Sequence, residues 1–168
     1  MKIVSNSTAA TIEFGRQLGA LAQPGQCIAL HGPLGAGKTH LVRGIASGAQ
    51  VADPEIVSSP TYVLLNIYPA DPANPHSKTV YHLDAYRTHG AEDFAALDLG
   101  DFLSATDDAS KEAPGIVVIE WAARIGPLLP ADHLAITLEP ADDTTRELAI
   151  SASGPASQLL VAKLLTKK

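Results

Sequence analysis

The sequence predicts an α/β domain with a mostly parallel central sheet, to which one antiparallel hairpin is added. The first observation is Gly32–Thr39, GPLGAGKT, which fits the pattern G-x-x-x-x-G-K-[ST] of a phosphate-binding loop. The second is its setting, because an apolar run at Gln26–His31 predicts a buried strand and helical periodicity follows the loop. The third is Ile116–Ile119, a continuous apolar run that is typical of a central strand buried on both faces. Strand, glycine loop and helix in this order predict the three-layer P-loop fold of nucleoside triphosphatases.

Two amphipathic helices are predicted in the first 50 residues, after a short apolar start at Met1–Val4. The first helix is capped by Ser7 or Thr8 and extends to about Ala22. The second follows the glycine loop and ends near Ser47-Gly48. Apolar side chains share one face of each helix: Phe14, Leu18 and Leu21 in the first, and Leu41, Val42, Ile45, Ala46 and Ala49 in the second.

Each residue type of the glycine loop suits the binding of a phosphate. Gly32, Gly35 and Gly37 allow the backbone to approach a ligand where a Cβ atom would clash. Successive backbone N–H groups, with the positive end of the next helix, then surround an anion. Lys38 brings a full charge to the β- and γ-phosphates, and the Thr39 hydroxyl is the expected Mg²⁺ ligand.

The middle of the chain predicts an antiparallel hairpin. After a loop at Ala49–Val57, the segments Thr61–Tyr68 and Thr79–Tyr86 are rich in β-branched and aromatic residues and predict two strands. Pro69–Lys78 contains three prolines and predicts an exposed tip between them. The elements expected after the hairpin are, in chain order: one or two short helices at Ala91–Leu103, broken near Gly100, with Phe94, Leu97, Phe102 and Leu103 inward; a polar segment at Thr106–Pro114; the central strand; a turn or short helix at Arg124–Pro130; strands at His133–Leu138 and Arg146–Ser151; and a helix at Pro155–Leu165 with Ala156, Leu159, Leu160 and Leu164 on one face.

Length and composition limit the class of protein. The 168 residues suffice for one domain with its own core, which we expect to span residues 1–168. The formal net charge of −6 argues against a free-standing nucleic-acid binder, because such proteins usually carry a basic surface. Cys27 is the one cysteine, so an internal disulfide is excluded, and its apolar neighbours indicate a core residue. No stretch is long and apolar enough to span a membrane and the N-terminus lacks a signal-like core, so we expect a soluble, cytoplasmic protein.

Glu120 is the clearest candidate metal ligand outside the glycine loop. It follows directly after Ile116–Ile119, where P-loop proteins carry the acidic residue that holds Mg²⁺. The alternative is a strand-end carboxylate that faces solvent. Trp121, the one tryptophan, either packs over a nucleotide or belongs to the core.

Polar residues in and after the predicted hairpin are further candidates. Asp84 is a candidate for orienting an attacking water or holding a metal-bound water, and otherwise caps a turn or pairs with Arg87. Thr61 is a candidate sensor of γ-phosphate and Mg²⁺, with a turn fixed by proline as the alternative. His82 is expected to be a structural residue rather than a base. Arg87 is a candidate for stabilising charge on the γ-phosphate, with a surface ion pair as the alternative. Arg146 is a candidate for contact with the nucleotide, with a solvent-facing position as the alternative.

Four segments in this order resemble the bacterial TsaE (YjeE) family: Gly35–Thr39, Ser59-Pro60-Thr61-Tyr62, His82–Arg87 and Glu120-Trp121. The glycine loop is shared by many families, whereas the set of the other three is far more specific. Leu129-Pro130 and the strand that starts at Arg146 also fit, so the resemblance covers nearly the whole chain.

This resemblance implies a small Mg²⁺-dependent ATPase that acts in the synthesis of threonylcarbamoyladenosine, beside the anticodon of certain tRNAs. It implies ATP and Mg²⁺ as cofactors and slow hydrolysis by the protein alone. It also implies two partner proteins, TsaD and TsaB, and contact with tRNA only indirectly, through the assembly with these partners. The site residues that it implies are, by role: Asp84, Thr61 and Trp121 in catalysis; Gly35, Ala36, Gly37, Lys38, Thr39, His40 and Arg146 in nucleotide binding; and Thr39 and Glu120 in metal binding.

The sequence departs from the family pattern in three places. Pro33 stands where the family usually has a polar residue. The segments Asp71–Lys78 and Thr106–Pro114 are longer than usual in the family, a difference that affects the geometry of the surface toward partners more than the chemistry of the site. Three other functions stay open. They are a small-molecule kinase, although the chain has no Arg-rich lid segment; a GTP-driven switch, although no Asn-Lys-x-Asp segment is present; and a scaffold that binds ATP without hydrolysing it.

Overall fold

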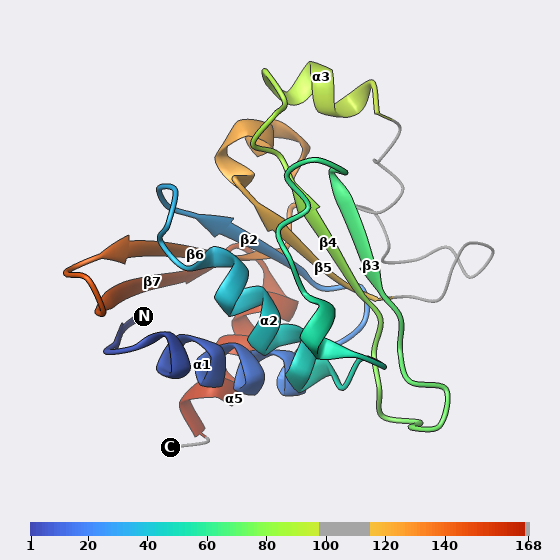
Figure 1. Ribbon diagram of the computed structural model, residues 1–168, viewed down its shortest axis with the longest axis vertical. Coiled ribbons are helices and arrows are strands. Elements are labelled where there is room, and N and C mark those ends of the chain that lie inside the picture. Colours follow the sequence, from blue (N-terminus) through green and yellow to red (C-terminus); the bar gives the residue numbers. More distant parts are fainter. Residues whose placement is uncertain (98–114, 167–168) are drawn as a thin grey trace.

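The computed structural model describes residues 1–97 and 115–166 (Figure 1). Its elements, with η for a 3-10 helix, are in chain order: β1 (Lys2–Ser5), α1 (Thr8–Leu21), β2 (Cys27–His31), α2 (Lys38–Ala49), η1 (Pro54–Ile56), β3 (Leu65–Tyr68), β4 (Val80–Asp84), α3 (Ala91–Ala95), β5 (Ile116–Glu120), η2 (Ala122–Leu128), β6 (His133–Pro140), β7 (Arg146–Ala152) and α5 (Pro155–Thr166). The predicted polar segment Thr106–Pro114 lies outside the described residues, as do the expected helix break near Gly100 and the inward Phe102 and Leu103.

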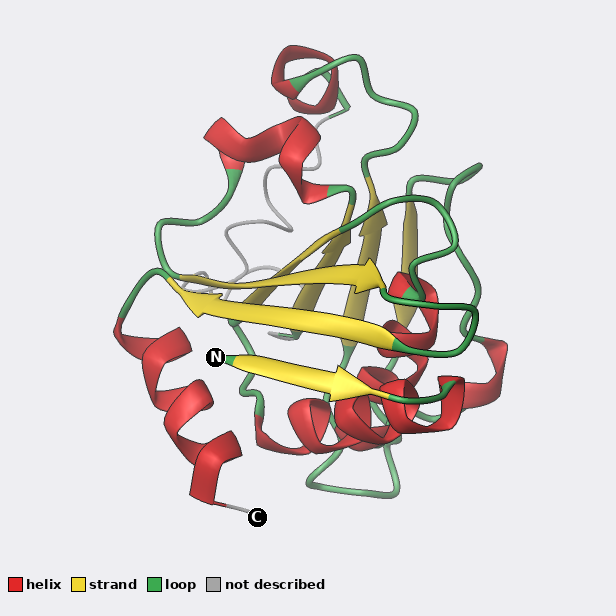
Figure 2. Cartoon of the chain, turned by 90° about the vertical axis from the view of Figure 1, so that its left-hand side faces the viewer, coloured by secondary structure: helices red, strands yellow, loops and turns green. Residues whose placement is uncertain are grey.

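The described strands form one seven-stranded sheet in the order β1-β7-β6-β2-β5-β4-β3 (Figures 1 and 2). Strands β6, β2, β5 and β4 are parallel, whereas β3, β7 and β1 pair in antiparallel fashion toward the two edges. This arrangement confirms the predicted α/β class, its mostly parallel centre and the β3–β4 hairpin. A second hairpin, β6–β7, was not part of the prediction, and the apolar start forms the edge strand β1. The glycine loop therefore follows the second strand of the chain.

Helices cover both faces of the sheet and produce the expected three layers (Figure 1). Side chains of a strand alternate between the two faces. Ile28 and Leu30 of β2 accordingly belong to a buried cluster with residues of α1, α2 and α5. Ala29 belongs to a second buried cluster with Phe94 of α3 and Ile125 of η2. Strand β5 contributes to both clusters and is buried throughout, as its apolar run predicts.

Helices α1 and α2 begin and pack largely as their patterns predict. The Ser7 hydroxyl accepts a hydrogen bond from the backbone N–H of Ala10, so Ser7 is the N-cap of α1. The predicted apolar face of α2 is fully buried. The two helices approach closely because four glycines line their contact, a feature that the periodicity did not reveal: Gly15, Gly19, Gly44 and Gly48. A Cβ atom at any of the four would overlap the backbone of the facing helix.

The predicted strand Thr61–Tyr68 is wrong in its first half, since β3 begins only at Leu65. The carbonyl oxygen of Pro60 accepts hydrogen bonds from the N–H groups of Val63 and Leu64, which closes a turn. Leu64 adopts a positive φ of 69° at the end of this turn. The β-branched and aromatic residues favour a strand here, but the local hydrogen bonds to Pro60 prevail over that propensity.

Smaller predictions about exposure have mixed outcomes. Phe94 is buried as expected, whereas Leu97 is 40% exposed, so the prediction that it faces inward is wrong. Leu159 is 57% exposed although Leu160 and Leu164, predicted on the same helix face, are buried. The expected loop at residues 49–57 contains the short helix η1. Cys27 is a core residue, and burial raises the pKa of its thiol to about 12. In the part of the chain that the structure describes, no helix has the length and apolar character needed to cross a membrane.

We expect Gly48→Ala to lower the free energy of unfolding by about 1–3 kcal/mol, although alanine favours a helix over glycine. The added methyl group would overlap the carbonyl oxygen of Arg16 and force α1 and α2 apart. Urea unfolding followed by circular dichroism measures the change. Gly126→Ala is the matched control, because nothing lies within 4 Å of a Cβ atom built at Gly126. Equal stability of the two variants would contradict the close helix contact.

Candidate functional site

The glycine loop lies between the carboxyl end of β2 and the first residue of α2. Gly35 and Gly37 have φ values of 77° and 99°, which L side chains rarely adopt. A Cβ atom at Gly35 would meet nothing within 4 Å, so the loop presents its backbone to open space. No side chain caps the N-terminus of α2 at Gly37. The loop therefore offers backbone N–H groups at a helix N-terminus, which is the chemistry that binds a phosphate.

Lys38 is held inside this loop. Its Nζ donates hydrogen bonds to the carbonyl oxygens of Gly32 and Pro33 at 2.9 and 2.8 Å. The same ammonium lies 4.0 Å from the ring centroid of Trp121, a cation–π contact. Burial lowers the pKa of Lys38, and the carboxylates of Glu120 and Asp84 oppose that effect. The result is a poorly hydrated ammonium at the loop, which is suited to an anionic ligand.

Glu120 and Thr39 meet at the edge of the sheet where the parallel strands end. Glu120 is opposite Leu30 of β2 and opposite Asp84 of β4 in the sheet register. The Thr39 hydroxyl donates a hydrogen bond to Glu120 Oε1 at 2.8 Å. Glu120 is only 3% exposed, so the alternative of a strand-end carboxylate facing solvent does not hold.

Hydroxyl and carboxylate oxygens are ligands that Mg²⁺ prefers. Among the described residues, no group of three or more His, Cys, Asp or Glu side chains could hold a metal ion. The pair of Thr39 and Glu120 nevertheless fits Mg²⁺, because this ion is usually held by one or two protein ligands, with waters and phosphate oxygens as the rest. The donor set therefore suits a metal that arrives with a phosphate compound.

Asp84 holds the turn that precedes β3. Its Oδ2 accepts hydrogen bonds from the hydroxyls of Thr61 at 2.6 Å and Ser59 at 3.2 Å. Its Oδ1 accepts a hydrogen bond from the backbone N–H of Tyr86 at 2.8 Å. Asp84 thus caps a turn, and the guanidinium of Arg87 lies over the ring of Tyr62 at 4.3 Å.

Three further residues, His40, Trp121 and Arg146, complete the surroundings of the loop. A Cβ atom built at Gly37 would lie 3.8 Å from Arg146 Nε and 3.9 Å from His40 Nδ1, so both side chains reach the loop. Trp121 is half-buried, and its φ of 58° places it in the left-handed region directly after Glu120. Its ring also contacts the ring of Tyr86, with centroids 4.9 Å apart. The residues predicted for the site are therefore brought together by the fold.

Two further contacts could not be predicted from the sequence. His82 Nε2 lies 3.0 Å from Glu120 Oε1, and the Tyr68 hydroxyl lies 3.4 Å from His82 Nδ1. His82 is fully buried, which agrees with the expectation of a structural residue. The alternation of polar and apolar residues in β4 places His82 in the sheet but cannot show which group it meets.

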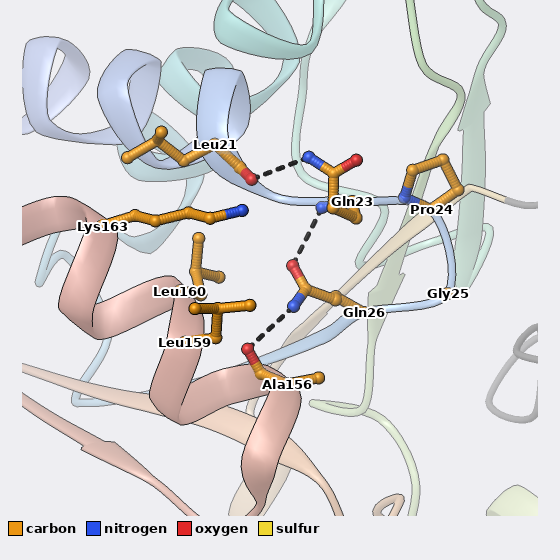
Figure 3. A pocket seen from close by; sticks show the side chains of 9 residues that line it. All are labelled: Leu21, Gln23, Pro24, Gly25, Gln26, Ala156, Leu159, Leu160 and Lys163. Atoms are coloured by element: carbon orange, nitrogen blue, oxygen red, sulfur yellow. Dashed lines mark hydrogen bonds between the residues drawn. The ribbon is translucent and has the colours of Figure 1, made fainter.

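A cavity of about 290 Å³ lies at the other end of β2, between the turn after α1 and helix α5 (Figure 3). Figure 3 shows Gln26 joined by hydrogen bonds to Gln23 and Ala156, with Leu159 and Lys163 beside them. None of the predicted site residues lines this cavity. The chemistry of the predicted site is therefore confined to the carboxyl end of the parallel strands, where open α/β sheets place their ligands.

Comparisons with known proteins point to one family. A family model described as "Threonylcarbamoyl adenosine biosynthesis protein TsaE" matches residues 5–148. Relatives with the name "tRNA threonylcarbamoyladenosine biosynthesis protein TsaE" include one from Treponema pallidum, 34% identical over 90% of this chain and 100% of its own. Another, from Mycobacterium leprae, is 39% identical over 77% of this chain and 76% of its own. A crystal structure of Bacillus subtilis YdiB matches with a TM-score of 0.77 and 27% identity, over 99% of this chain and 95% of that one.

We expect Thr61→Ala to speed amide hydrogen exchange in the turn of residues 61–64. The substitution removes the 2.6 Å hydrogen bond to Asp84, and such bonds to charged groups contribute about 1.5–3 kcal/mol. Exchange measured by mass spectrometry should accelerate roughly 10- to 100-fold in this segment. Thr144→Ala removes a threonine–aspartate hydrogen bond in the β6–β7 turn and is the matched control. An equal effect of both variants on residues 61–64 would contradict the role of Asp84 in this turn.

Proposed function

Because the chain belongs to the TsaE family, which is involved in the biosynthesis of threonylcarbamoyladenosine in tRNA, we propose that it is a slow, Mg²⁺-dependent ATPase that supports this modification. We further propose that residues 1–168 act as one cytoplasmic domain, and that TsaD and TsaB are its partners. The net charge of −6 supports a tRNA contact that is made mainly by the partners, since free tRNA binding usually needs a basic surface.

The observation that carries the proposal is the pairing of Thr39 with Glu120 beside the glycine loop. A hydroxyl from α2 and a carboxylate from β5 lie 2.8 Å apart, at a position adjacent to backbone N–H groups that suit a phosphate. A helix N-terminus alone would fit any anion. The added metal-ligand pair favours a nucleoside triphosphate with Mg²⁺ over a simple phosphate ester.

In this proposal, the N–H groups of Gly35–Thr39 bind the β- and γ-phosphates of ATP, and Lys38 binds them with its ammonium group. Thr39 and Glu120 would hold Mg²⁺, and the chemistry that a bound Mg²⁺ supplies is neutralisation of charge on the phosphate that is transferred. Asp84 or Thr61 positions the attacking water. Trp121 covers the site beside Lys38, and His40 and Arg146 contact the nucleotide near Gly37.

We propose that hydrolysis by the isolated protein is slow, because the sequence contains no evident arginine finger. Arg146 reaches Gly37, but its Nη1 donates a hydrogen bond to the carbonyl oxygen of Asp143. An arginine finger contributes on the order of 10³–10⁵ in rate in P-loop enzymes. We propose that docking of the partners completes the site or regulates it.

We expect Lys38→Ala to weaken ATP binding roughly 10- to 100-fold, because a charge-assisted contact contributes about 1.5–3 kcal/mol. Glu120→Ala should mainly lower Mg²⁺-dependent hydrolysis and affect ATP binding without metal much less. Isothermal titration calorimetry and phosphate release measure the two effects. Lys163→Ala is the matched control, since Lys163 lines the distant cavity. Unchanged binding and hydrolysis in both site variants would overturn the site assignment.

The function itself is tested by ATP hydrolysis of the purified protein, alone and then with TsaD and TsaB. We expect slow turnover that rises with the partners and is lost in Glu120→Ala. An ATP hydrolysis rate that does not change when TsaD and TsaB are added would contradict a partner-regulated ATPase. Turnover that requires an added small acceptor, with a phosphorylated product, would favour a small-molecule kinase instead.

A further inference from the structure

We propose that His82, supported by Tyr68, is a positioning residue that directs Glu120 toward Thr39. The inference rests on the proposed Mg²⁺-dependent ATPase, because it concerns the carboxylate that would hold the metal there. It starts from a hydrogen-bonded chain of side chains, from Tyr68 through His82 and Glu120 to Thr39. These hydrogen-bonded side chains lie mostly in the interior, and no step of the proposed reaction uses Tyr68 or His82.

The contact between His82 and Glu120 has a defined direction. A carboxylate only accepts hydrogen bonds, so the Nε2–H of His82 donates to Glu120 Oε1 at 3.0 Å. Thr39 donates to the same oxygen at 2.8 Å. His82 is 0% exposed and Glu120 is 3% exposed, so water competes little with either contact. The carboxylate is therefore oriented by one donor from the sheet and one from α2.

Tyr68 fixes the other side of the imidazole. Its hydroxyl lies 3.4 Å from His82 Nδ1, and the centroids of the two rings are 6.1 Å apart. The same hydroxyl accepts a hydrogen bond from the N–H of Ser58 at 3.3 Å and lies 3.2 Å from the Ser58 carbonyl oxygen. Asn66 Nδ2 donates to it at 3.2 Å. Tyr68 thus connects the imidazole to the backbone at Ser58.

The segment of residues 58–61 is in this way connected to both strand-end carboxylates. Ser58 reaches Glu120 through Tyr68 and His82, whereas Ser59 and Thr61 bind Asp84 directly. Because His82 has no exposed surface, it cannot touch a nucleotide and acts only through Glu120. Hydrogen-bond partners of metal ligands typically alter metal affinity 10- to 100-fold when they are removed.

The test is a Mg²⁺ titration of the full-length protein at saturating adenylyl imidodiphosphate, a non-hydrolysable ATP analogue, followed by Trp121 fluorescence. Trp121 is the one tryptophan of the chain and follows Glu120 directly. We expect His82→Leu to raise the midpoint Mg²⁺ concentration roughly 10- to 100-fold. His82→Gln keeps an N–H donor and should restore most of the wild-type value. Tyr68→Phe, which removes one hydroxyl, should raise the midpoint by a smaller factor, while binding of the analogue in EDTA stays unchanged in all three variants.

His133→Leu is the matched control, because His133 is half-buried on β6 and its Nδ1 contacts the carbonyl oxygen of Pro130. The thermal unfolding temperature of every variant is also measured, so that an effect on the orientation of Glu120 can be separated from a loss of packing in the core. A His82→Leu protein with a lower unfolding temperature but the wild-type Mg²⁺ midpoint would overturn the proposal. If His82→Leu does not fold, an unchanged midpoint in Tyr68→Phe overturns it and a raised midpoint supports it. A wild-type protein without any Mg²⁺ response would overturn the proposed function, and this inference with it.

Discussion

The parallel pairing of β2 with β5, and of β5 with β4, is the constraint on which the candidate site depends. It sets Leu30 opposite Glu120 and Glu120 opposite Asp84, so that the ends of three strands meet at one edge of the sheet. The glycine loop leaves β2 at the same edge and returns as α2. Thr39 therefore meets Glu120, although the two residues are 81 positions apart in the chain. A shift of one residue in either pairing would turn the carboxylate to the other face of the sheet.

The position of α2 depends in turn on its contact with α1. Thr39 lies in the first turn of α2, so the reach of its hydroxyl toward Glu120 follows from where the whole helix lies on the sheet. Four glycines allow the backbones of α1 and α2 to touch, which keeps α2 close to its neighbour. A wider spacing would move the first turn of α2 relative to β5. The packing of α1 against α2 and the position of Thr39 at the site are therefore connected through helix α2.

The sequence predicted those parts of the fold whose signals are local. The loop pattern, the apolar run Ile116–Ile119 and the face of α2 each depend on neighbouring residues, and the structure agrees with them. Glu120 could be chosen because it follows its strand directly. The turn before β3 could not be predicted, because hydrogen bonds to the Pro60 carbonyl oxygen form there in spite of the strand propensity of the residues. The contacts of His82 could not be found either, because they depend on which strands become neighbours, and that order is a property of the whole sheet.

The burial of charge at this edge is better explained by ligand binding than by stability. Among the described residues, the buried lysine, aspartate and glutamate side chains are Lys38, Asp84 and Glu120, and all three belong to the candidate site. Replacing buried ionic groups by apolar residues of similar volume is often neutral or stabilising by about 1–4 kcal/mol. A fold selected for stability alone would have little reason to keep them. Their hydrogen bonds to Gly32, Thr61 and Thr39 make them tolerable in the interior and also aim them at one location beside the loop. These buried charged groups are thus the ones that a magnesium nucleotide would meet.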